Sequence, residues 1–235
     1  MKKSKICIIG NSVALRVRPP VEIPNNKNYS QLLRDNSDNN FDIVNLGYGA
    51  STVKDIYGTI DSFIREFPDY YIINLGVVDA STREVPLWFY RLATKKSLNP
   101  FYVFNALFYR NILSKFRRSL VNLRGRRSWI SQKRFGKYFE LIIKSLVKET
   151  NAKIIVLSIN EANERVEKQL PGSFRKHRIY NLIMKEITNH YTQIFLDTNK
   201  ILVLTDYPDG VHFSEAGHKK IAEKLHSIIS QNKKY

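Results

Sequence analysis

Short apolar runs alternate with longer amphipathic stretches along this chain. The runs lie near residues 5–9, 41–45, 70–75, 153–159 and 193–196. Apolar runs of this length, separated by segments of helical character, are typical of the strands of a parallel sheet. The pattern therefore predicts a single α/β domain over residues 1–235, with a central parallel five-stranded sheet covered by helices on both faces.

Side chains that can cap helices mark where three of the helices should begin. Thr52 followed by Asp55 predicts a capping box for a helix that runs to about residue 66. Ser128 predicts the start of a helix to about residue 150, whose apolar positions recur at spacings of three and four. Ser214 predicts the start of the last helix.

The connection between the third and fourth strands is much longer than a single helix requires. It runs from Ala80 to Asn151, and we interpret residues 86–127 as an insertion that forms one or two helices beside the sheet. Between Val85 and Phe139 there are 13 Lys or Arg residues, no Asp or Glu, and 13 of the 28 aromatic residues. Because the net charge of the chain is +17, these 13 positive charges leave only +4 for everything else. The basic character belongs mainly to this segment.

Three interpretations of the basic, aromatic insertion stay open. Its helices can be solvated on one face, with their aromatic side chains turned to the core. Alternatively they form a surface for anionic lipid or a lipid-linked anionic glycan, because basic side chains interleaved with Trp, Phe and Tyr suit an interfacial helix such as 101–118. A surface for nucleic acid is the least favoured of the three interpretations. The positive charge suits a phosphate backbone, but no nucleic-acid recognition motif accompanies it.

Polar and glycine-rich loops follow four of the predicted strands. They are Gly10-Asn11-Ser12, the segment 45–49, the segment 76–79 and the segment 209–214. Ligands of open parallel sheets gather at the carboxyl ends of the strands, so these loops should share one edge. Each loop alone is also an ordinary turn or helix cap, and it is their conjunction that indicates a site.

A serine nucleophile needs a base within hydrogen-bond reach and a third group that orients the base. Ser12 and His212 fit the first two roles. Asp209 lies three residues before His212, so one loop can present both side chains. The candidate donors to an oxyanion are the backbone N–H groups of Ser12 and Gly49, the latter because a missing Cβ permits close approach of a substrate.

These segments, in this order, resemble the conserved blocks of the SGNH, or GDSL, hydrolase superfamily. Ser12 falls on the nucleophile, with Asn11 where Asp is usual, and Asp209 with His212 matches the closing D-x-x-H block. The segment 45–52 resembles the block of the oxyanion glycine with one residue fewer, and we assign Gly49 rather than Gly47. The resemblance implies a three-layer, flavodoxin-like fold with strand order 2-1-3-4-5 and a serine esterase or acyltransferase activity.

The third block departs from the family pattern. In Gly-Val-Val-Asp at 76–79, Val78 occupies the place of the family's Asn, and the loss of one oxyanion donor typically lowers a rate roughly 10²-fold to 10³-fold. Asn74, Asn160 and Arg83 are possible replacements. Asp79 is also a candidate substrate-binding residue, although the favoured interpretation is that it holds loops together through backbone N–H groups. A third block with valine at this position and a following arginine, as with Val78 and Arg83 here, is similar to that of SGNH-like proteins from bacterial surface-polysaccharide loci. This resemblance makes Val78 and Arg83 candidate substrate-binding residues.

The resulting hypothesis is an O-acyl, in particular O-acetyl, esterase or acyltransferase. It would act on an acylated carbohydrate, a glycolipid or a surface-polysaccharide precursor through an acyl-serine intermediate. Two alternatives stay open: a lipid esterase that docks on membranes, and a catalytically degenerate module that binds anionic glycan or lipid.

Cofactors, metals and compartment are constrained by what the sequence does not contain. No metal-ligand spacing or phosphate-binding loop is present, so we expect neither cofactor nor metal, with acetyl-CoA as an acyl donor only for a transferase. The apolar run Ile6–Ile9 is too short for a secretion signal, and no run approaches the length of a bilayer span. The single Cys7 should be a buried thiol. We expect a cytoplasmic protein, with peripheral contact at the inner face of an anionic membrane through 86–127.

Overall fold

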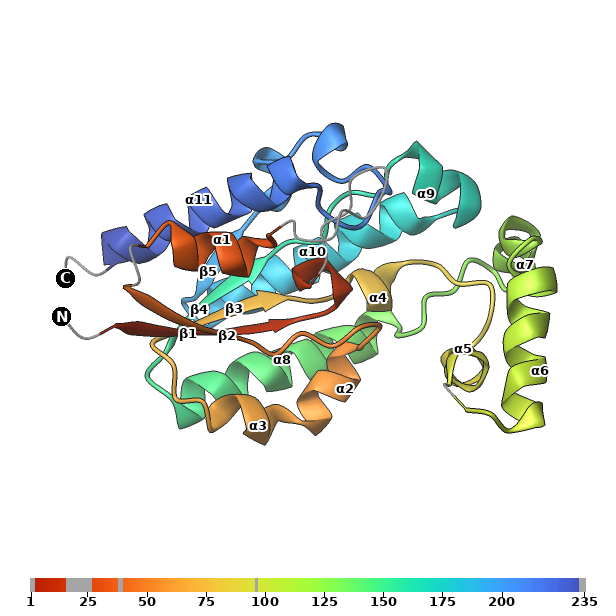
Figure 1. Cartoon of the computed structure of the whole chain (residues 1–235), viewed down its shortest axis with the longest axis horizontal. Helices are drawn as coiled ribbons and strands as arrows, with labels where there is room; N and C mark the ends of the chain where they lie inside the picture. The colour runs from red at the N-terminus through yellow and green to blue at the C-terminus, as the bar shows by residue number, and fades with distance from the viewer. Residues whose placement is uncertain (1–2, 16–26, 38–39, 96, 233–235) are drawn as a thin grey trace.

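A five-stranded parallel sheet forms the centre of the molecule (Figure 1). The computed structural model describes residues 3–15, 27–37, 40–95 and 97–232. The strands are β1 (Ser4–Gly10), β2 (Phe41–Asn45), β3 (Tyr70–Asn74), β4 (Lys153–Leu157) and β5 (Ile194–Leu196). They are hydrogen-bonded in the order β2-β1-β3-β4-β5, and every pair is parallel. The predicted fold class and strand order are confirmed.

Helices cover both faces of the sheet (Figure 1). One face carries α1 (Tyr29–Asp35) and α11 (Glu215–Asn232). The other carries α2 (Val53–Gly58), α3 (Ile60–Ile64), α8 (Gln132–Glu149) and α10 (Ser173–His190). The short helices α4 (Val77–Ala80) and α9 (Glu164–Gln169) follow the carboxyl ends of β3 and β4.

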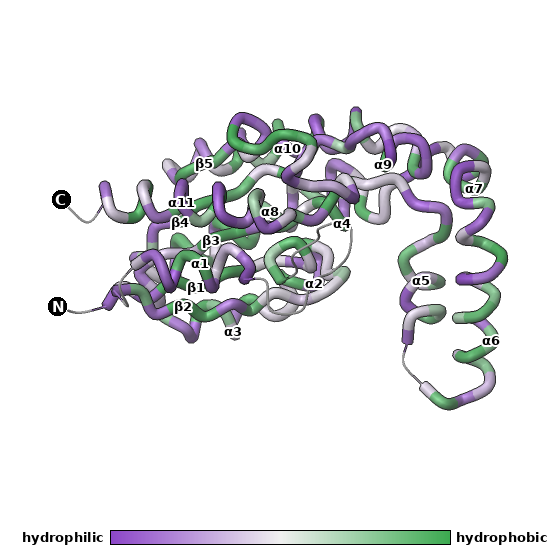
Figure 2. Tube along the Cα trace, turned by 45° about the horizontal axis from the view of Figure 1, so that its top comes forward, coloured by the Kyte–Doolittle hydropathy of each residue, from purple (hydrophilic) through white to green (hydrophobic). Residues whose placement is uncertain are grey.

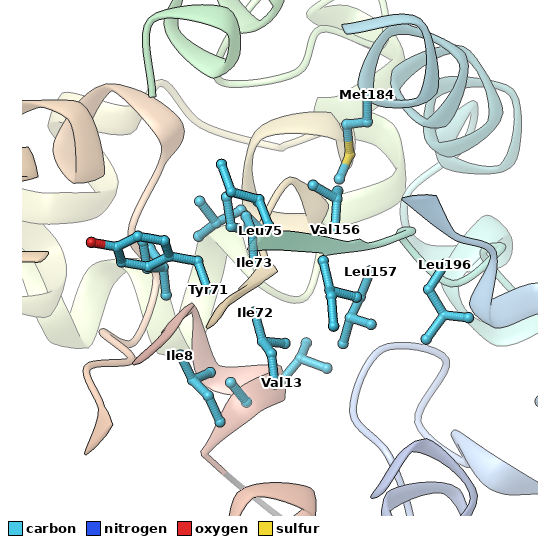
Figure 3. Packing of buried hydrophobic residues seen from close by; sticks show 14 of the residues in the cluster. Ile8, Val13, Tyr71, Ile72, Ile73, Leu75, Val156, Leu157, Met184 and Leu196 are labelled. Carbon is cyan, nitrogen blue, oxygen red and sulfur yellow. The ribbon is translucent and has the colours of Figure 1, made fainter. Parts of the chain in front are cut away.

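The central strands are apolar without interruption because both of their faces are covered. Ile72 of β3 points to the side of Leu157, whereas Ile73 points to the opposite side, toward Val156 and the α10 residue Met184 (Figure 3). The seven isoleucines of the three interior strands β1, β3 and β4 are fully buried, as is the lone Cys7, whose pKa is raised to about 12 by burial. Two apolar layers therefore fix the sheet and the loops at its carboxyl edge.

The capping box predicted at Thr52 is present, but the helix it begins is shorter than expected. The Thr52 hydroxyl accepts from the N–H of Asp55, and the Asp55 carboxylate accepts from the N–H of Thr52 at 2.9 Å. The helix ends at Gly58, and α3 begins at Ile60 after a non-helical Thr59. Glycine weakens a helix by about 1 kcal/mol relative to alanine, which favours the interruption at this point.

Ser128 does not cap a helix, so that prediction is wrong. The helix α8 begins at Gln132, with Ser131 at its N-cap. Ser128 instead pairs with Thr82 in an isolated antiparallel bridge, and its hydroxyl donates to the Ala80 carbonyl at 2.7 Å. The extended backbone of this bridge excludes a helical start at Ser128. At the last helix, by contrast, the predicted cap is present, because the Ser214 hydroxyl accepts from the N–H of Gly217.

Residues 86–127, which we call the appendage, form three short helices and a π-helical turn. These are α5 (Leu87–Thr94), α6 (Pro100–Phe108), the turn Tyr109–Leu113 and α7 (Arg117–Leu123). They stand off the body beyond the carboxyl ends of the strands, with α5 and α6 side by side (Figures 1 and 2). The expectation of one or two helices beside the sheet is therefore wrong in number and placement. Within the described residues, no helix combines the length and apolar character that a bilayer span requires.

Candidate active site

Ser12, His212 and Asp209 form a continuous hydrogen-bonded chain at the carboxyl edge of the sheet. The Oγ atom of Ser12 lies 2.9 Å from Nε2 of His212, and Nδ1 of His212 lies 2.8 Å from Oδ2 of Asp209. Ser12 opens a 3₁₀ turn directly after β1, where the Asn11 side chain caps the turn by accepting from the Val13 N–H. Two loops that are 200 residues apart in the sequence thus place a hydroxyl, an imidazole and a carboxylate in the geometry of a nucleophile, a base and an orienting group.

The loop that carries His212 is folded around the Asp209 carboxylate. Oδ1 of Asp209 accepts from the N–H groups of Val211 and His212 at 2.9 and 2.8 Å, while Oδ2 faces the imidazole. Gly210 has a φ of +82°, and a Cβ at this position would overlap the side chains of Asn163 and Val166. This tight turn requires glycine at its second position.

Hydrogen bonds to Asp209 favour its ionised form. Burial raises the pKa of this carboxyl, but hydrogen bonds from the side chain and backbone of His212 outweigh burial and hold the pKa below its usual value. An ionised Asp209 accepts from Nδ1–H, which leaves Nε2 of His212 free to accept the proton of Ser12.

Two backbone N–H groups near Ser12 are available to an oxyanion. Among the residues that the structure describes, the N–H groups of Ser12 and Gly49 donate to no acceptor. The N–H of Gly47, in contrast, donates to the side chain of Asn45 at 3.1 Å. Tyr48 donates its N–H to the Gly10 carbonyl at 3.0 Å, which holds the Gly49 loop against the end of β1. The contacts favour Gly49 over Gly47 as the oxyanion glycine.

Val78 and two of its possible replacements are buried. Val78 is buried on α4 and has no side-chain donor. The Asn160 amide donates to the Val211 carbonyl at 3.3 Å, so it supports the His212 loop instead. Asn74 is buried at the end of β3, and within the described chain its side-chain nitrogen has no hydrogen-bond partner. Neither asparagine is open to a substrate.

Arg83 and Asp79 support neighbouring segments. The guanidinium of Arg83 lies 4.2 Å from the ring centroid of Trp129. Asp79 is fully buried, and its Oδ1 accepts from the N–H of Val53 at 3.0 Å, at the start of α2. Within the described chain neither residue has a hydrogen bond or ion pair with the serine, histidine and aspartate above. Their assignment to substrate binding stays a prediction.

Sequence reasoning missed a second buried histidine that contacts the site's supporting loops. Nε2 of His177 lies 2.9 Å from Oγ of Ser81, and Nδ1 lies 2.7 Å from the Asn160 carbonyl. Burial lowers the pKa of His177 to about 4, so the imidazole is neutral, donating from Nδ1 and accepting at Nε2. Because Asn160 also holds Val211, this pairing links α4 and α10 to the His212 loop. One indication is present in the sequence. His177, Tyr180 and Met184 recur at spacings of three and four, which places them on the same buried face of α10.

A cavity of about 470 Å³ opens beside Gly49. One wall comes from the loop and α2 of the body, and the other comes from α5 of the appendage. Its lining includes the aromatic residues Tyr48 and Tyr90 and the basic residues Arg91 and Lys95. The cavity borders the candidate oxyanion residue Gly49, but neither Ser12 nor His212 lines it. A cavity in this position could hold the part of a substrate that does not react.

The model of the GDSL-like lipase/acylhydrolase family matches residues 8–220 of the sequence, a range that includes Ser12, Asp209 and His212. The chain belongs to this family. A search of the curated proteins finds no match to the sequence.

Solved structures of the same class are similar over nearly the whole chain. A lipase/acylhydrolase from Enterococcus faecalis has a TM-score of 0.65 at 16% identity, covering 99% of this chain and 97% of its own. An acetyl xylan esterase has a TM-score of 0.64 at 15% identity, covering 96% and 99%. An acetylxylan esterase from Geobacillus stearothermophilus has a TM-score of 0.59 at 18% identity, covering 95% and 93%. At these identities the likeness shows the fold.

Proposed function

We propose that this protein is a serine-dependent O-acyl, in particular O-acetyl, esterase or acyltransferase acting on an acylated carbohydrate through an acyl-serine intermediate. The observation that carries the proposal is the hydrogen-bonded chain from Ser12 through His212 to Asp209, with distances of 2.9 and 2.8 Å. This arrangement supplies the activated hydroxyl that a bare serine lacks.

The proposed reaction begins when Oγ of Ser12 attacks the ester carbonyl and its proton passes to Nε2 of His212. The carbonyl oxygen becomes an oxyanion that accepts from the N–H groups of Ser12 and Gly49. When the C–O bond of the ester breaks, His212 returns the proton to the leaving alcohol. Water then attacks the acyl-serine in an esterase, and a sugar hydroxyl does so in a transferase. His212 takes the proton of the attacking group and delivers it to Oγ of Ser12 as the bond between the acyl group and Oγ breaks. Asp209 keeps the imidazole in the required tautomer throughout.

A carbohydrate substrate is supported by the cavity beside Gly49. Tyr48 and Tyr90 offer aromatic surface for sugar rings, and Arg91 and Lys95 offer donors for hydroxyl or acidic groups. Two structural neighbours are described as acetylxylan esterases. The serine chemistry itself needs no cofactor, and acetyl-CoA would enter only as the donor of a transferase.

Labelling with a fluorophosphonate, read by intact mass, tests the nucleophile. The wild type should take up one label and hydrolyse p-nitrophenyl acetate, and Ser12→Ala should lose both properties. Ser119→Ala, at an exposed serine of the appendage, is the matched control and should behave as the wild type. An unlabelled wild type, or undiminished turnover in Ser12→Ala, would contradict the mechanism.

A second measurement separates esterase from transferase. Acetylated xylo-oligosaccharide is incubated with the wild type, with and without an unacetylated glycan acceptor. The masses of both sugars are then measured by mass spectrometry. Release of acetate regardless of the acceptor identifies an esterase. A gain of acetyl mass on the acceptor, absent in Ser12→Ala, identifies a transferase.

A further inference from the structure

The appendage carries a group of exposed apolar side chains. We define the apolar stripe as Leu98, Phe101, Phe104, Ile112 and Phe116. Leu98 is 98% exposed, Phe104 is 67% exposed and Phe116 is 61% exposed. Figure 2 shows α6 as a largely apolar segment at the far edge of the molecule. Several large apolar side chains left exposed on one short stretch of chain indicate a surface that meets another phase or partner.

The turn that follows α6 is fixed to the body, and α6 itself packs against α5. The Tyr109 hydroxyl donates to Oε1 of Glu84 at 2.7 Å, and the same oxygen accepts from Nε of Arg117 at 2.9 Å. The Tyr109 ring also meets Tyr90 of α5 edge to face, with centroids 5.8 Å apart. Glu84 is buried, which makes this contact a firm anchor between the body and the appendage.

The appendage is strongly basic and contains no acidic residue. Between residues 86 and 127 there are ten Lys or Arg residues and no Asp or Glu. Arg91 and Arg117 pair with Asp55 and Glu84 of the body. The exposed basic side chains of the appendage that have no carboxylate partner within the described residues are Lys95, Arg110, Lys115, Arg118, Arg126 and Arg127. Unpaired positive charge beside exposed phenylalanine is complementary to an anionic, partly apolar surface.

We propose that the apolar stripe docks into the interface of a phospholipid bilayer containing anionic lipids, with the surrounding Lys and Arg side chains on the phosphate groups. Burial of phenylalanine in the acyl boundary and attraction of the unpaired cations act together in this arrangement. A second copy of the chain is disfavoured as the occupant because two appendages would bring like charges together. A nucleic acid would satisfy the cations and leave the phenylalanines exposed.

The docked orientation brings the active-site edge to the membrane. The appendage follows β3 and α4 in the chain and projects beyond the carboxyl ends of the strands (Figure 1). Ser12, which directly follows β1, lies at the same edge of the sheet. A lipid-linked acylated glycan at the bilayer surface would then be within reach of the cavity beside Gly49. The docking itself does not depend on the serine chemistry.

Vesicle sedimentation with the full-length protein tests the docking. Vesicles of phosphatidylcholine alone are compared with vesicles that also contain phosphatidylglycerol. The wild type should bind only the anionic vesicles, and the partition coefficient should fall at least about tenfold in Phe101→Ser/Phe104→Ser. It should fall by about the same factor in Lys115→Gln/Arg118→Gln. The control Phe67→Ser/Leu182→Ser removes side chains that are 70% and 59% exposed outside the appendage, and should bind as the wild type does.

Several outcomes would overturn the proposal. They are equal binding of the wild type and both appendage variants, equal binding to neutral and anionic vesicles, and no vesicle binding at all. A dimer in sedimentation velocity that Phe101→Ser/Phe104→Ser dissociates, without vesicle binding, would identify a second copy as the occupant. Salt-sensitive binding of single-stranded DNA that survives this substitution, without vesicle binding, would identify nucleic acid.

Two further controls separate docking from catalysis and from folding. Ser12→Ala should bind vesicles as the wild type does, and the phenylalanine variant should hydrolyse soluble p-nitrophenyl acetate at the wild-type rate. The phenylalanine variant should also melt at the wild-type temperature, because both side chains are exposed.

Discussion

Asp209 has two tasks within one loop, and they can be separated by substitution. Oδ1 organises the backbone of Val211 and His212, whereas Oδ2 fixes the imidazole tautomer. Asp209→Asn can keep a carbonyl oxygen for the backbone but places an amide where Nδ1–H requires an acceptor. We expect kcat for p-nitrophenyl acetate to fall roughly 10⁴-fold with little change in melting temperature. The control is Asp61→Asn, at an exposed position on α3. A loss smaller than tenfold would rule out the orienting role.

Asp79 makes stability depend on pH. Burial raises its pKa to about 8, aided by Asp55 and opposed by the Val53 N–H and Arg83, whereas the ordinary value is 3.8. The folded state therefore holds the proton more tightly than the unfolded chain. The contribution of Asp79 to the free energy of unfolding is therefore complete below pH 3.8 and is lost as the pH rises to about 8.

The substitution Asp79→Asn tests this dependence, because it keeps an acceptor for Val53 and cannot ionise. We expect the variant to gain about 1–3 kcal/mol relative to the wild type at a pH near 8. The gain should shrink toward pH 4. Urea denaturation at the two pH values measures the difference, and a gain independent of pH would contradict the raised pKa.

The turn between β5 and α11 depends on its glycine. Gly210→Ala would force a Cβ into Asn163 and Val166 at a φ of +82°. We expect this turn to shift, with kcat lowered at least about tenfold and the protein destabilised by about 1–3 kcal/mol. Gly58→Ala is the matched control, since a Cβ there meets nothing within 4 Å. Unchanged turnover in Gly210→Ala would show that the His212 loop tolerates another backbone path.

Glu84 is predicted to hold the appendage on the body. Burial opposes its ionisation, but Arg117 leads the groups that keep its pKa below the usual value. Glu84→Ala removes the acceptor of both Tyr109 and Arg117 and leaves the partly buried arginine unpaired, at a cost of about 3–5 kcal/mol. Hydrogen exchange should accelerate in α6 and α7 more than in β1 and β3. The exposed Glu164→Ala is the control, and uniform exchange changes would contradict a local anchor.

The elements that sequence reasoning placed correctly are those whose signal is local. The five strands are continuous apolar runs, and the segments near Ser12 and His212 follow strands directly, so topology alone brings them to one edge. The missed features depend on distant partners. Ser128 looks like a helix cap until Thr82 pairs with it, 46 positions earlier in the chain. The contact of His177 with Ser81 spans 96 positions and leaves no motif. The interruption at Gly58, in contrast, has a local signal, because glycine is a poor helix former.

The body and the appendage meet at a narrow root, which predicts that they are separable. The chain leaves and re-enters the body at the Thr82–Ser128 bridge, where the Arg83 N–H also donates to the Arg127 carbonyl at 3.0 Å. Replacing residues 86–127 by a short glycine-serine link should leave a folded protein that hydrolyses p-nitrophenyl acetate and no longer binds anionic vesicles. Circular dichroism, turnover and sedimentation measure the three properties. An unfolded product would show that the body needs the appendage to fold.

The positive charge of the molecule is concentrated near the appendage, and this affects how quickly the protein associates with a charged surface. Since 13 basic residues fall between Val85 and Phe139, ten of them in the appendage, and only +4 remains elsewhere, the positive charge is displaced toward the appendage end and gives the molecule an electric dipole in that direction. Near a negatively charged plane this dipole experiences a torque, and the end with the active site turns to face the plane before contact. The field is screened beyond about 8 Å at physiological salt. The rate of productive encounters should therefore fall steeply with ionic strength, while the rate of dissociation changes much less.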